Sequence, residues 1–106
     1  MTVCIGVDLG GTKIAAAAVN LETGAVTGRV VEPTEAHEGP QRVLARVANV
    51  VKQVGAANGA DQVVTAVGMG VPGVLDPATG TTKLLPNLAT GWRNVPAGSE
   101  LARLTG

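Results

Sequence analysis

Residues 6–13 read GVDLGGTK, and this octapeptide decides how the chain begins to fold. The run from Thr2 to Leu9 that leads into it is apolar, with β-branched residues at alternate positions, and therefore predicts a buried strand. Two glycines then break that strand. A second apolar run begins at once, over Lys13 to Asn20, so the octapeptide is predicted to form the bend between two strands.

The second run is rich in alanine, which favours helices, so its composition by itself is ambiguous. Its short length and the turn residues that follow at 22–24 favour a strand and a hairpin. A third strand is predicted over Ala25 to Glu32, ended by Pro33. The chain is therefore expected to open with a three-stranded antiparallel meander.

Beyond the meander, the pattern predicts a helix, a strand, a hairpin and a short helix. The first helix runs from Gly39 to about Asn58, because its valines recur at three- and four-residue spacing. A buried strand follows over Val63 to Val71, and turn residues from Asp76 to Gly80 are expected to join two short strands. Residues 84–93 are predicted to be a loop and Ala97 to Leu104 a second helix. This order of elements indicates an α/β fold.

The composition is that of one globular domain over residues 1–106. It is 45% hydrophobic but only 1% aromatic, so the core must be aliphatic, with Trp92 as a packing plug. Eight basic and eight acidic residues cancel, which gives no electrostatic reason to bind nucleic acid or an anionic membrane. No apolar run is long enough to span a bilayer, and the N-terminus does not resemble a signal peptide. The single cysteine, Cys4, is expected to be a buried thiol. Together with the absence of a second cysteine, these features predict a cytoplasmic protein.

The octapeptide also carries residues suited to phosphate binding. Gly10 and Gly11 permit a positive φ and leave backbone N–H groups free to approach an anion. Thr12 adds a hydroxyl donor and Lys13 adds a positive charge. Asp8 would lie beside the phosphates, where Mg²⁺ held through water would neutralise its carboxylate. The sequence therefore predicts a site for a metal–nucleotide complex; the alternative is that Asp8 and Lys13 form an ion pair at the strand ends.

Two other phosphate motifs are matched only in part. Residues 6–13 approach the Walker pattern G-x-x-x-x-G-K-[ST], but the order is Thr-Lys and a strand is expected to follow where that motif needs a helix. Residues 68–73 (GMGVPG) have the spacing of a dinucleotide-binding turn, but Pro72 prevents a helix from opening there. Neither a Walker loop nor a dinucleotide site is predicted.

Three blocks of the sequence, taken together, resemble the ROK family (repressor, open reading frame, kinase), a branch of the actin-like ATPase superfamily. They are residues 5–13, with Asp-x-Gly-Gly-Thr-Lys; residues 67–80, of the form G-x-G-x-P-G-x-x-D followed by a Gly-Thr turn; and residues 86–92, with Pro-Asn-Leu and Gly-Trp. The resemblance implies a partial actin-like ATPase (ribonuclease H-like) lobe. It also implies the family's reaction, in which the γ-phosphate of ATP moves to a hydroxyl of a hexose, most commonly glucose.

The resemblance implies functions for seven residues of this chain. Those of the first block would bind Mg²⁺ and the phosphates of ATP, and two later residues match positions on the sugar side of the cleft, where an asparagine amide both donates and accepts hydrogen bonds. The alternative for the two later residues is that they only shape turns. The set is Asp8 for the metal, Gly10, Gly11, Thr12 and Lys13 for the phosphates, and Gly73 and Asn87 for the sugar.

The family pattern continues beyond the position of Gly106. In the family, an Asn-Asp pair follows soon after that point, and its aspartate is the general base; a His-rich zinc motif and the lobe that grips adenine come later. Residues 1–106 are therefore expected to bind phosphates but to have no kinase activity alone. The sequence leaves open the identity of the sugar, ATP or polyphosphate as the donor, and a homo-oligomer of the full-length protein.

Three other interpretations assign a different function. A sugar-sensing repressor of the same family carries a winged helix-turn-helix ahead of the phosphate motif, and the motif here begins at Ile5, which leaves no room for one. A chaperone-like ATPase of the superfamily is disfavoured by the Val-Pro-Gly and Pro-Asn-Leu blocks. A non-catalytic, partly folded fragment stays open, because a sheet that lacks its later strands exposes an edge and apolar surface.

Overall fold

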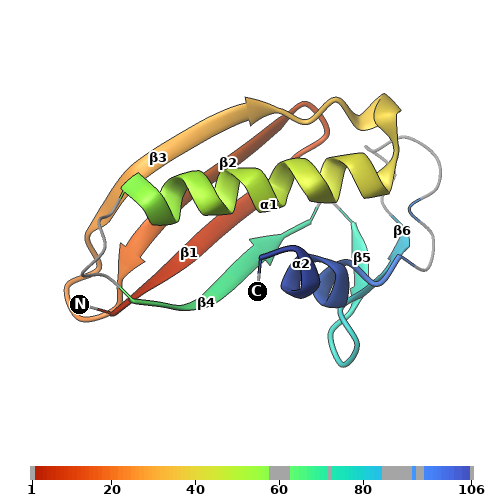
Figure 1. Cartoon of the computed structure of the whole chain (residues 1–106). Helices are drawn as coiled ribbons and strands as arrows, with labels where there is room; N and C mark the ends of the chain where they lie inside the picture. Colours follow the sequence, from red (N-terminus) through yellow and green to blue (C-terminus); the bar gives the residue numbers. More distant parts are fainter. Residues whose placement is uncertain (1, 58–62, 72, 85–91, 93–94, 106) are drawn as a thin grey trace.

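The computed structural model describes residues 2–57, 63–71, 73–84, 92 and 95–105. Their main elements follow the predicted order of three strands, a helix, a strand, a hairpin and a second helix. One four-stranded sheet is covered on one face by the long helix, and the hairpin and the second helix lie beyond the sheet (Figure 1). The predicted α/β fold is confirmed.

The first three strands are β1 (Thr2–Leu9), β2 (Lys13–Asn20) and β3 (Val26–Pro33), and they form the predicted antiparallel meander. The fourth strand, β4 (Val63–Gly70), lies on the other side of β1, so the sheet order is β3-β2-β1-β4. β4 runs parallel to β1. The carboxyl ends of β1 and β4 therefore meet at the same end of the sheet, which is where open α/β sheets bind ligands.

Helix α1 (Pro40–Ala57) packs across one face of this sheet (Figure 1). Its valines form the apolar face that their spacing predicts, and full burial of each such side chain stabilises the fold by about 1.5–3 kcal/mol. The core residues that these three elements contribute are Val43, Leu44, Val47, Ala48, Val50, Val51 and Val54 of α1, Val3, Ile5, Val7 and Leu9 of β1, and Ile14, Ala16 and Ala18 of β2.

The opposite face of the sheet is open in the described part of the chain. On β1, Gly6 and Asp8 are exposed and Cys4 is half-buried; on β4, Ala66 and Gly68, which pair with Cys4 and Gly6, are exposed. The prediction that β1 and β4 are buried strands is therefore wrong for this face, and so is the prediction of a buried Cys4 thiol. The physical reason is that α1 covers one side only and no other described element packs on the second side.

The predicted hairpin is formed by β5 (Val74–Asp76) and β6 (Thr81–Leu84). The Asp76 carboxylate accepts the Ala78 N–H at 3.0 Å, which is ordinary turn chemistry and agrees with the predicted turn. Leu84, predicted to begin a loop, is the last residue of β6, because its backbone still pairs with β5.

Helix α2 (Ala97–Thr105) packs against α1, and Trp92 before it is buried, as its predicted function of plug requires. One short element was not predicted: a 3-10 helix, η1 (Ala36–Glu38), lies between β3 and α1. Glu35, which precedes it, has a φ of 53°, in the left-handed region that few non-glycine residues adopt.

Candidate phosphate-binding site

The bend between β1 and β2 is a tight hairpin. Gly10 N–H donates to the carbonyl of Lys13 at 2.9 Å, which leaves Gly11 and Thr12 as the two loop residues. Lys13 is the first residue of strand β2; after strand β4 ends at Gly70, the next described element is strand β5, which begins at Val74. Because both rejected motifs require a helix at these points, the decision against a Walker loop and a dinucleotide-binding turn agrees with the structure.

Gly10 is required for a reason different from the one predicted. A Cβ built on Gly10 would stand 3.0 Å from the carbonyl oxygen of Lys13, which belongs to the backbone and has little freedom to move. Neither Gly10 nor Gly11 adopts a positive φ; the described glycines that do so lie elsewhere. The positive φ that these glycines permit is therefore not used in this bend, and at Gly10 the requirement is the close approach of the two strands. The expectation of a free N–H is wrong for Gly10, because its N–H already donates to the Lys13 carbonyl.

The hairpin loop leaves hydrogen-bond donors available. Among the residues that the structure describes, no acceptor lies within bonding distance of the Gly11 or Thr12 amide. Thr12 and Lys13 are exposed. Two adjacent free amides, a hydroxyl and an ammonium are together the kind of donor set that binds phosphate oxygens.

Asp8 is exposed at the carboxyl end of β1, on the open face of the sheet. Its backbone pairs with Ala15 of β2 and with Gly70 of β4. Within the described ranges its carboxylate makes no ion pair with Lys13; the ion pairs found there involve other residues. The alternative of an Asp8–Lys13 ion pair is therefore wrong, and the carboxylate is available to a cation.

Glycines make the sheet accessible beside Asp8. A Cβ built on Gly6, Gly68 or Gly70 would meet nothing within 4 Å. Gly6 and Gly68 line, together with Asp8, a shallow depression of about 390 Å³ on the open face. A ligand can therefore approach the backbone of β1 and β4 closely at this point.

The two predicted sugar-side residues have different outcomes. Gly73 is exposed just beyond β4, and its N–H donates to the carbonyl of Val71 at 3.0 Å. Because Gly70 of β4 pairs with Asp8, the parallel pairing brings Gly73 to the end of the sheet that carries the glycine loop. Asn87 lies outside the described residues.

The carboxylate at this end of the sheet is a ligand that suits Mg²⁺. In the described residues, no group of three His, Cys, Asp or Glu side chains could hold a metal ion. Mg²⁺ does not need such a group, because it usually keeps several waters and is held by one or two carboxylates together with substrate phosphates. One exposed carboxylate, Asp8, beside the free amides of the loop matches that pattern.

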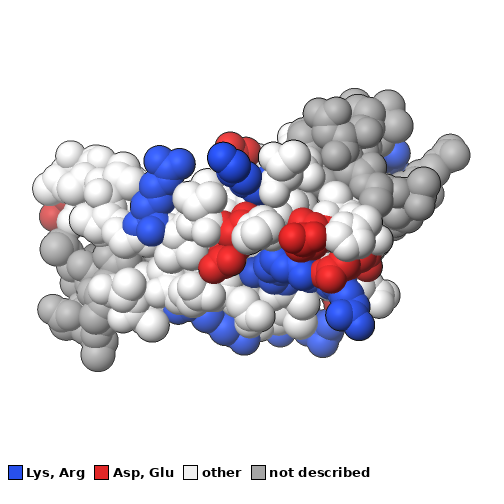
Figure 2. Space-filling model, turned by 90° about the horizontal axis from the view of Figure 1, so that it is seen from above, with Lys and Arg blue, Asp and Glu red and all other residues white. Residues whose placement is uncertain are grey.

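The charges elsewhere on the surface are mixed. Figure 2 shows cationic and anionic side chains interleaved on the face that it displays. One ion pair of the described residues joins Arg46 to Glu38, and the Arg46 hydrogen bond lowers the pKa of the Glu38 carboxyl below its ordinary value. Charges of both signs are thus mixed on this face, whereas the depression on the open face of the sheet is lined by both Asp8 and Arg29.

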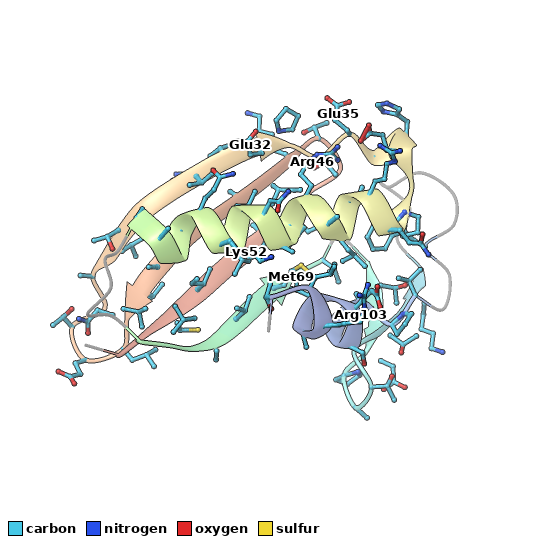
Figure 3. All side chains as sticks on the ribbon, viewed as in Figure 1. Glu32, Glu35, Arg46, Lys52, Met69 and Arg103 are labelled. Carbon is cyan, nitrogen blue, oxygen red and sulfur yellow. The ribbon has the colours of Figure 1, made fainter. Side chains whose placement is uncertain are left out.

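One residue that contacts the loop was not predicted from the sequence: Thr34. It is fully buried, although it opens a polar stretch. Its hydroxyl donates to the Gly10 carbonyl at 2.8 Å and its N–H donates to the Thr12 carbonyl at 2.9 Å. Arg46 extends from α1 toward the segment after β3 (Figure 3) and donates to the Thr34 carbonyl at 2.6 Å. No local signal could have identified Thr34, because its partner Gly10 lies 24 residues earlier.

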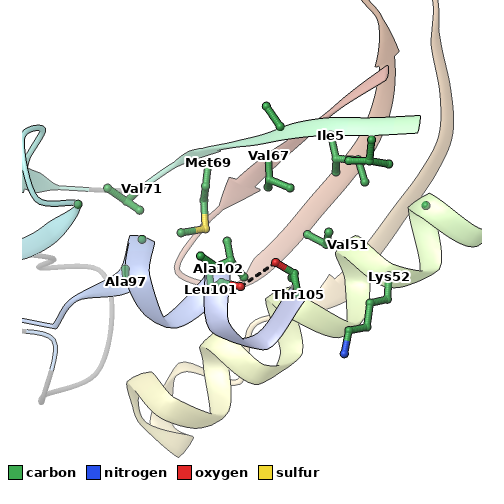
Figure 4. A pocket seen from close by; sticks show the side chains of 15 residues that line it. Ile5, Val51, Lys52, Val67, Met69, Val71, Ala97, Leu101, Ala102 and Thr105 are labelled. Carbon is green, nitrogen blue, oxygen red and sulfur yellow. Dashed lines mark hydrogen bonds between the residues drawn. The ribbon is translucent and has the colours of Figure 1, made fainter. Parts of the chain in front are cut away.

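A second hollow lies away from this site. It is a groove of about 640 Å³ bounded by β4, α1 and α2, and its lining is mainly aliphatic, with Val67 and Met69 on β4 and Leu101 on α2 (Figure 4). The hydroxyl of Thr105 in its wall already donates to the carbonyl of Leu101 at 2.8 Å. Of the six predicted site residues that the structure describes, none lines this groove, and its apolar chemistry does not suit a phosphate or a sugar.

Comparison with known proteins identifies relatives of this chain. A sequence model of the ROK family matches residues 4–106. A glucokinase of Thermotoga maritima is 36% identical over 102 residues, which are 96% of this chain but 30% of that protein. The chain thus spans under a third of the length of this curated relative.

Solved structures give the same result for the fold. The ROK hexokinase of Thermus thermophilus superposes with a TM-score of 0.84 at 34% identity, over 98% of this chain and 32% of that one. A ROK family glucokinase of Streptomyces griseus, solved in complex with glucose and AMPPNP, superposes with a TM-score of 0.81 at 29% identity, over 95% and 30%. The predicted fold class, part of an actin-like ATPase lobe, is confirmed by these similarities.

Proposed function

The chain belongs to the ROK family, and from this premise we propose that residues 1–106 supply the phosphate-binding part of a kinase site that transfers the γ-phosphate of ATP to a hydroxyl of a hexose. The observation that carries the proposal is the arrangement at the carboxyl end of β1. There, Asp8 has an exposed carboxylate, and Gly11 and Thr12 lie three and four residues after it. Within the described part of the chain this carboxylate makes no ion pair, and the two amides have no hydrogen-bond acceptor.

Each residue of the loop has a separate task in this proposal. The Gly11 and Thr12 amides and the Thr12 hydroxyl donate to oxygens of the β- and γ-phosphates, and Lys13 neutralises part of their charge. Asp8 would hold Mg²⁺, and the bound ion would neutralise charge on the phosphates. Phosphoryl transfer gains mainly from positioning and charge neutralisation, which are the two things these groups provide.

The donor and the acceptor of the phosphate are proposed from relatives. The Streptomyces griseus glucokinase was solved with glucose and AMPPNP, which supports an ATP-type donor and a hexose acceptor. Gly73 and Asn87 are proposed for the sugar side, on the family resemblance. Residues 1–106 are proposed to form one lobe of a longer cytoplasmic enzyme. In the described residues, no helix is long and apolar enough to cross a membrane.

The test is binding of nucleotide to the 106-residue chain, measured by isothermal titration calorimetry with and without Mg²⁺. Asp8→Asn should weaken Mg²⁺-dependent ATP binding by about tenfold or more, since hydrogen bonds and contacts to charged groups are worth about 1.5–3 kcal/mol. The matched control is Asp76→Asn, which removes a carboxylate from the β5–β6 turn while an amide oxygen can still accept the Ala78 N–H. Equal ATP affinity of wild type and Asp8→Asn would contradict the assignment of Asp8.

A second candidate is a non-catalytic fragment that is only partly folded. The observation in its favour is the incomplete cover of the sheet, with its open face and the apolar groove beside β4. A thermal melt separates the two candidates: a cooperative transition that Mg²⁺–ATP moves to higher temperature supports the phosphate-binding lobe. Absence of a cooperative transition supports a partly folded fragment. A regulatory ROK domain would bind sugar and fail to bind ATP.

A further inference from the structure

We infer that Thr34 is a positioning residue for the phosphate-binding loop: it fixes the direction of the Gly10–Gly11 peptide so that the Gly11 N–H, and not the Gly10 carbonyl oxygen, faces the nucleotide. The inference rests on the proposed function of the loop. Thr34 itself touches no ligand in this scheme, because it is fully buried behind the hairpin.

The geometry of the two hydrogen bonds explains the effect. Thr34 donates its hydroxyl to the Gly10 carbonyl at 2.8 Å and its N–H to the Thr12 carbonyl at 2.9 Å. The two bonds therefore hold the carbonyls on either side of Gly11. Both oxygens are drawn toward the buried threonine, and so away from the exposed side of the loop.

The planarity of the peptide bond transmits this constraint. In a trans peptide the carbonyl oxygen and the next N–H point in opposite directions, and the described residues contain no cis peptide bond. Holding the Gly10 oxygen toward Thr34 therefore aims the Gly11 N–H away from Thr34, toward solvent. This is one of the two amides without an acceptor in the described chain. A flipped peptide would instead place the Gly10 oxygen where a phosphate oxygen must lie, and the two would repel each other.

Helix α1 holds the threonine in place. Arg46 donates to the Thr34 carbonyl at 2.6 Å, and a second nitrogen of its guanidinium bonds to the Glu38 carboxylate. Glu38 lies in η1, directly ahead of α1. The loop is thus connected through Thr34 to Arg46 on a helix that packs on the core, which is the kind of support that keeps a binding loop rigid.

The experiment compares variants of the 106-residue chain with a matched control elsewhere in the fold. Thr34→Val keeps the shape but removes the hydroxyl, and Thr34→Ser keeps the hydroxyl. The control is Thr82→Val: Thr82 is the other fully buried threonine among the described residues, and its hydroxyl accepts the Val95 N–H at 3.1 Å, away from the loop. Both valine variants lose a buried hydrogen bond, so both should melt at a lower temperature.

The first readout is Mg²⁺–ATP affinity by calorimetry. Thr34→Val should weaken it about tenfold, Thr34→Ser should stay within about twofold of wild type, and Thr82→Val should leave it unchanged despite its lower melting temperature. Arg46→Gln changes a partly exposed side chain and is made in parallel, so that the inference can still be tested if Thr34→Val fails to fold. This variant is expected to bind Mg²⁺–ATP about threefold more weakly than the wild type. Equal affinities for wild type, Thr34→Val and Arg46→Gln would overturn the inference.

The second readout needs no nucleotide, so it separates this inference from the proposed function. The amide resonances of Gly11 and Thr12 in ¹H–¹⁵N spectra should shift or broaden in Thr34→Val and keep their wild-type positions in Thr34→Ser and Thr82→Val. If the wild type does not bind ATP, the proposed function fails, and this readout still decides whether Thr34 orders the loop. Unchanged Gly11 and Thr12 resonances in Thr34→Val would overturn the inference whatever the ATP result.

Discussion

Replacing Gly10 by alanine tests the closest backbone approach in the candidate site. The new Cβ would stand 3.0 Å from the Lys13 carbonyl oxygen, the same oxygen that accepts the Gly10 N–H at 2.9 Å. The neighbour is backbone of an adjacent strand, so relief requires that the hairpin open. Overpacking of this kind costs about 1–3 kcal/mol in measured cases.

Gly6→Ala is the matched control, because it adds the same methyl group four residues earlier, within strand β1. A Cβ there meets nothing within 4 Å, and no positive φ is required. Alanine at such a site reduces the freedom of the unfolded chain and is expected to stabilise by about 0.4–1 kcal/mol. The two variants should therefore differ in stability by at least about 1 kcal/mol, with Gly10→Ala the weaker.

The assay is thermal and urea unfolding followed by circular dichroism. In a domain of this size, a loss of about 1 kcal/mol lowers Tm by about 4–8 °C, so the difference between the two variants is well within measurement. Equal Tm values for Gly10→Ala and Gly6→Ala would refute the reasoning. That result would mean that the hairpin moves aside at no cost and that Gly10 serves no steric purpose in the loop.

Two further predictions concern pH and turnover. The Arg46 hydrogen bond holds the pKa of Glu38 below its ordinary value of 4.5, so the stability that this bond contributes is complete above pH 4.5 and is lost as the pH falls through the lowered pKa. Arg46→Gln should therefore flatten the dependence of Tm on pH below 4.5. An unchanged slope would contradict this prediction. The 106-residue chain is also expected to bind Mg²⁺–ATP without transferring phosphate, because the resemblance to the family places the general base after the position of Gly106. A coupled ADP-release assay over a panel of hexoses measures phosphate transfer. Sugar-dependent ADP release would show the expectation to be wrong.

Much of the site could be predicted because its residues are neighbours in the chain. Asp8, the two glycines, Thr12 and Lys13 lie within one hairpin, and the shift from an apolar strand to a glycine pair and back is visible locally. The detailed geometry of these residues could not be predicted from the sequence. The close approach at Gly10 and the free amide of Gly11 depend on how the two strands meet and on a threonine that is distant in sequence.

Periodicity and turn chemistry, which are local properties, were enough to determine the meander, helix α1 and the β5–β6 hairpin. The position of β4 beside β1 was decided only by the tertiary structure, because a parallel partner is chosen through packing under a crossover helix and leaves no mark on its own sequence. The same holds for Thr34. From the sequence, a threonine at the start of a polar stretch is predicted to lie on the surface. Thr34 is buried and hydrogen-bonds to the loop because β3 and α1 bring it against the backbone of Gly10.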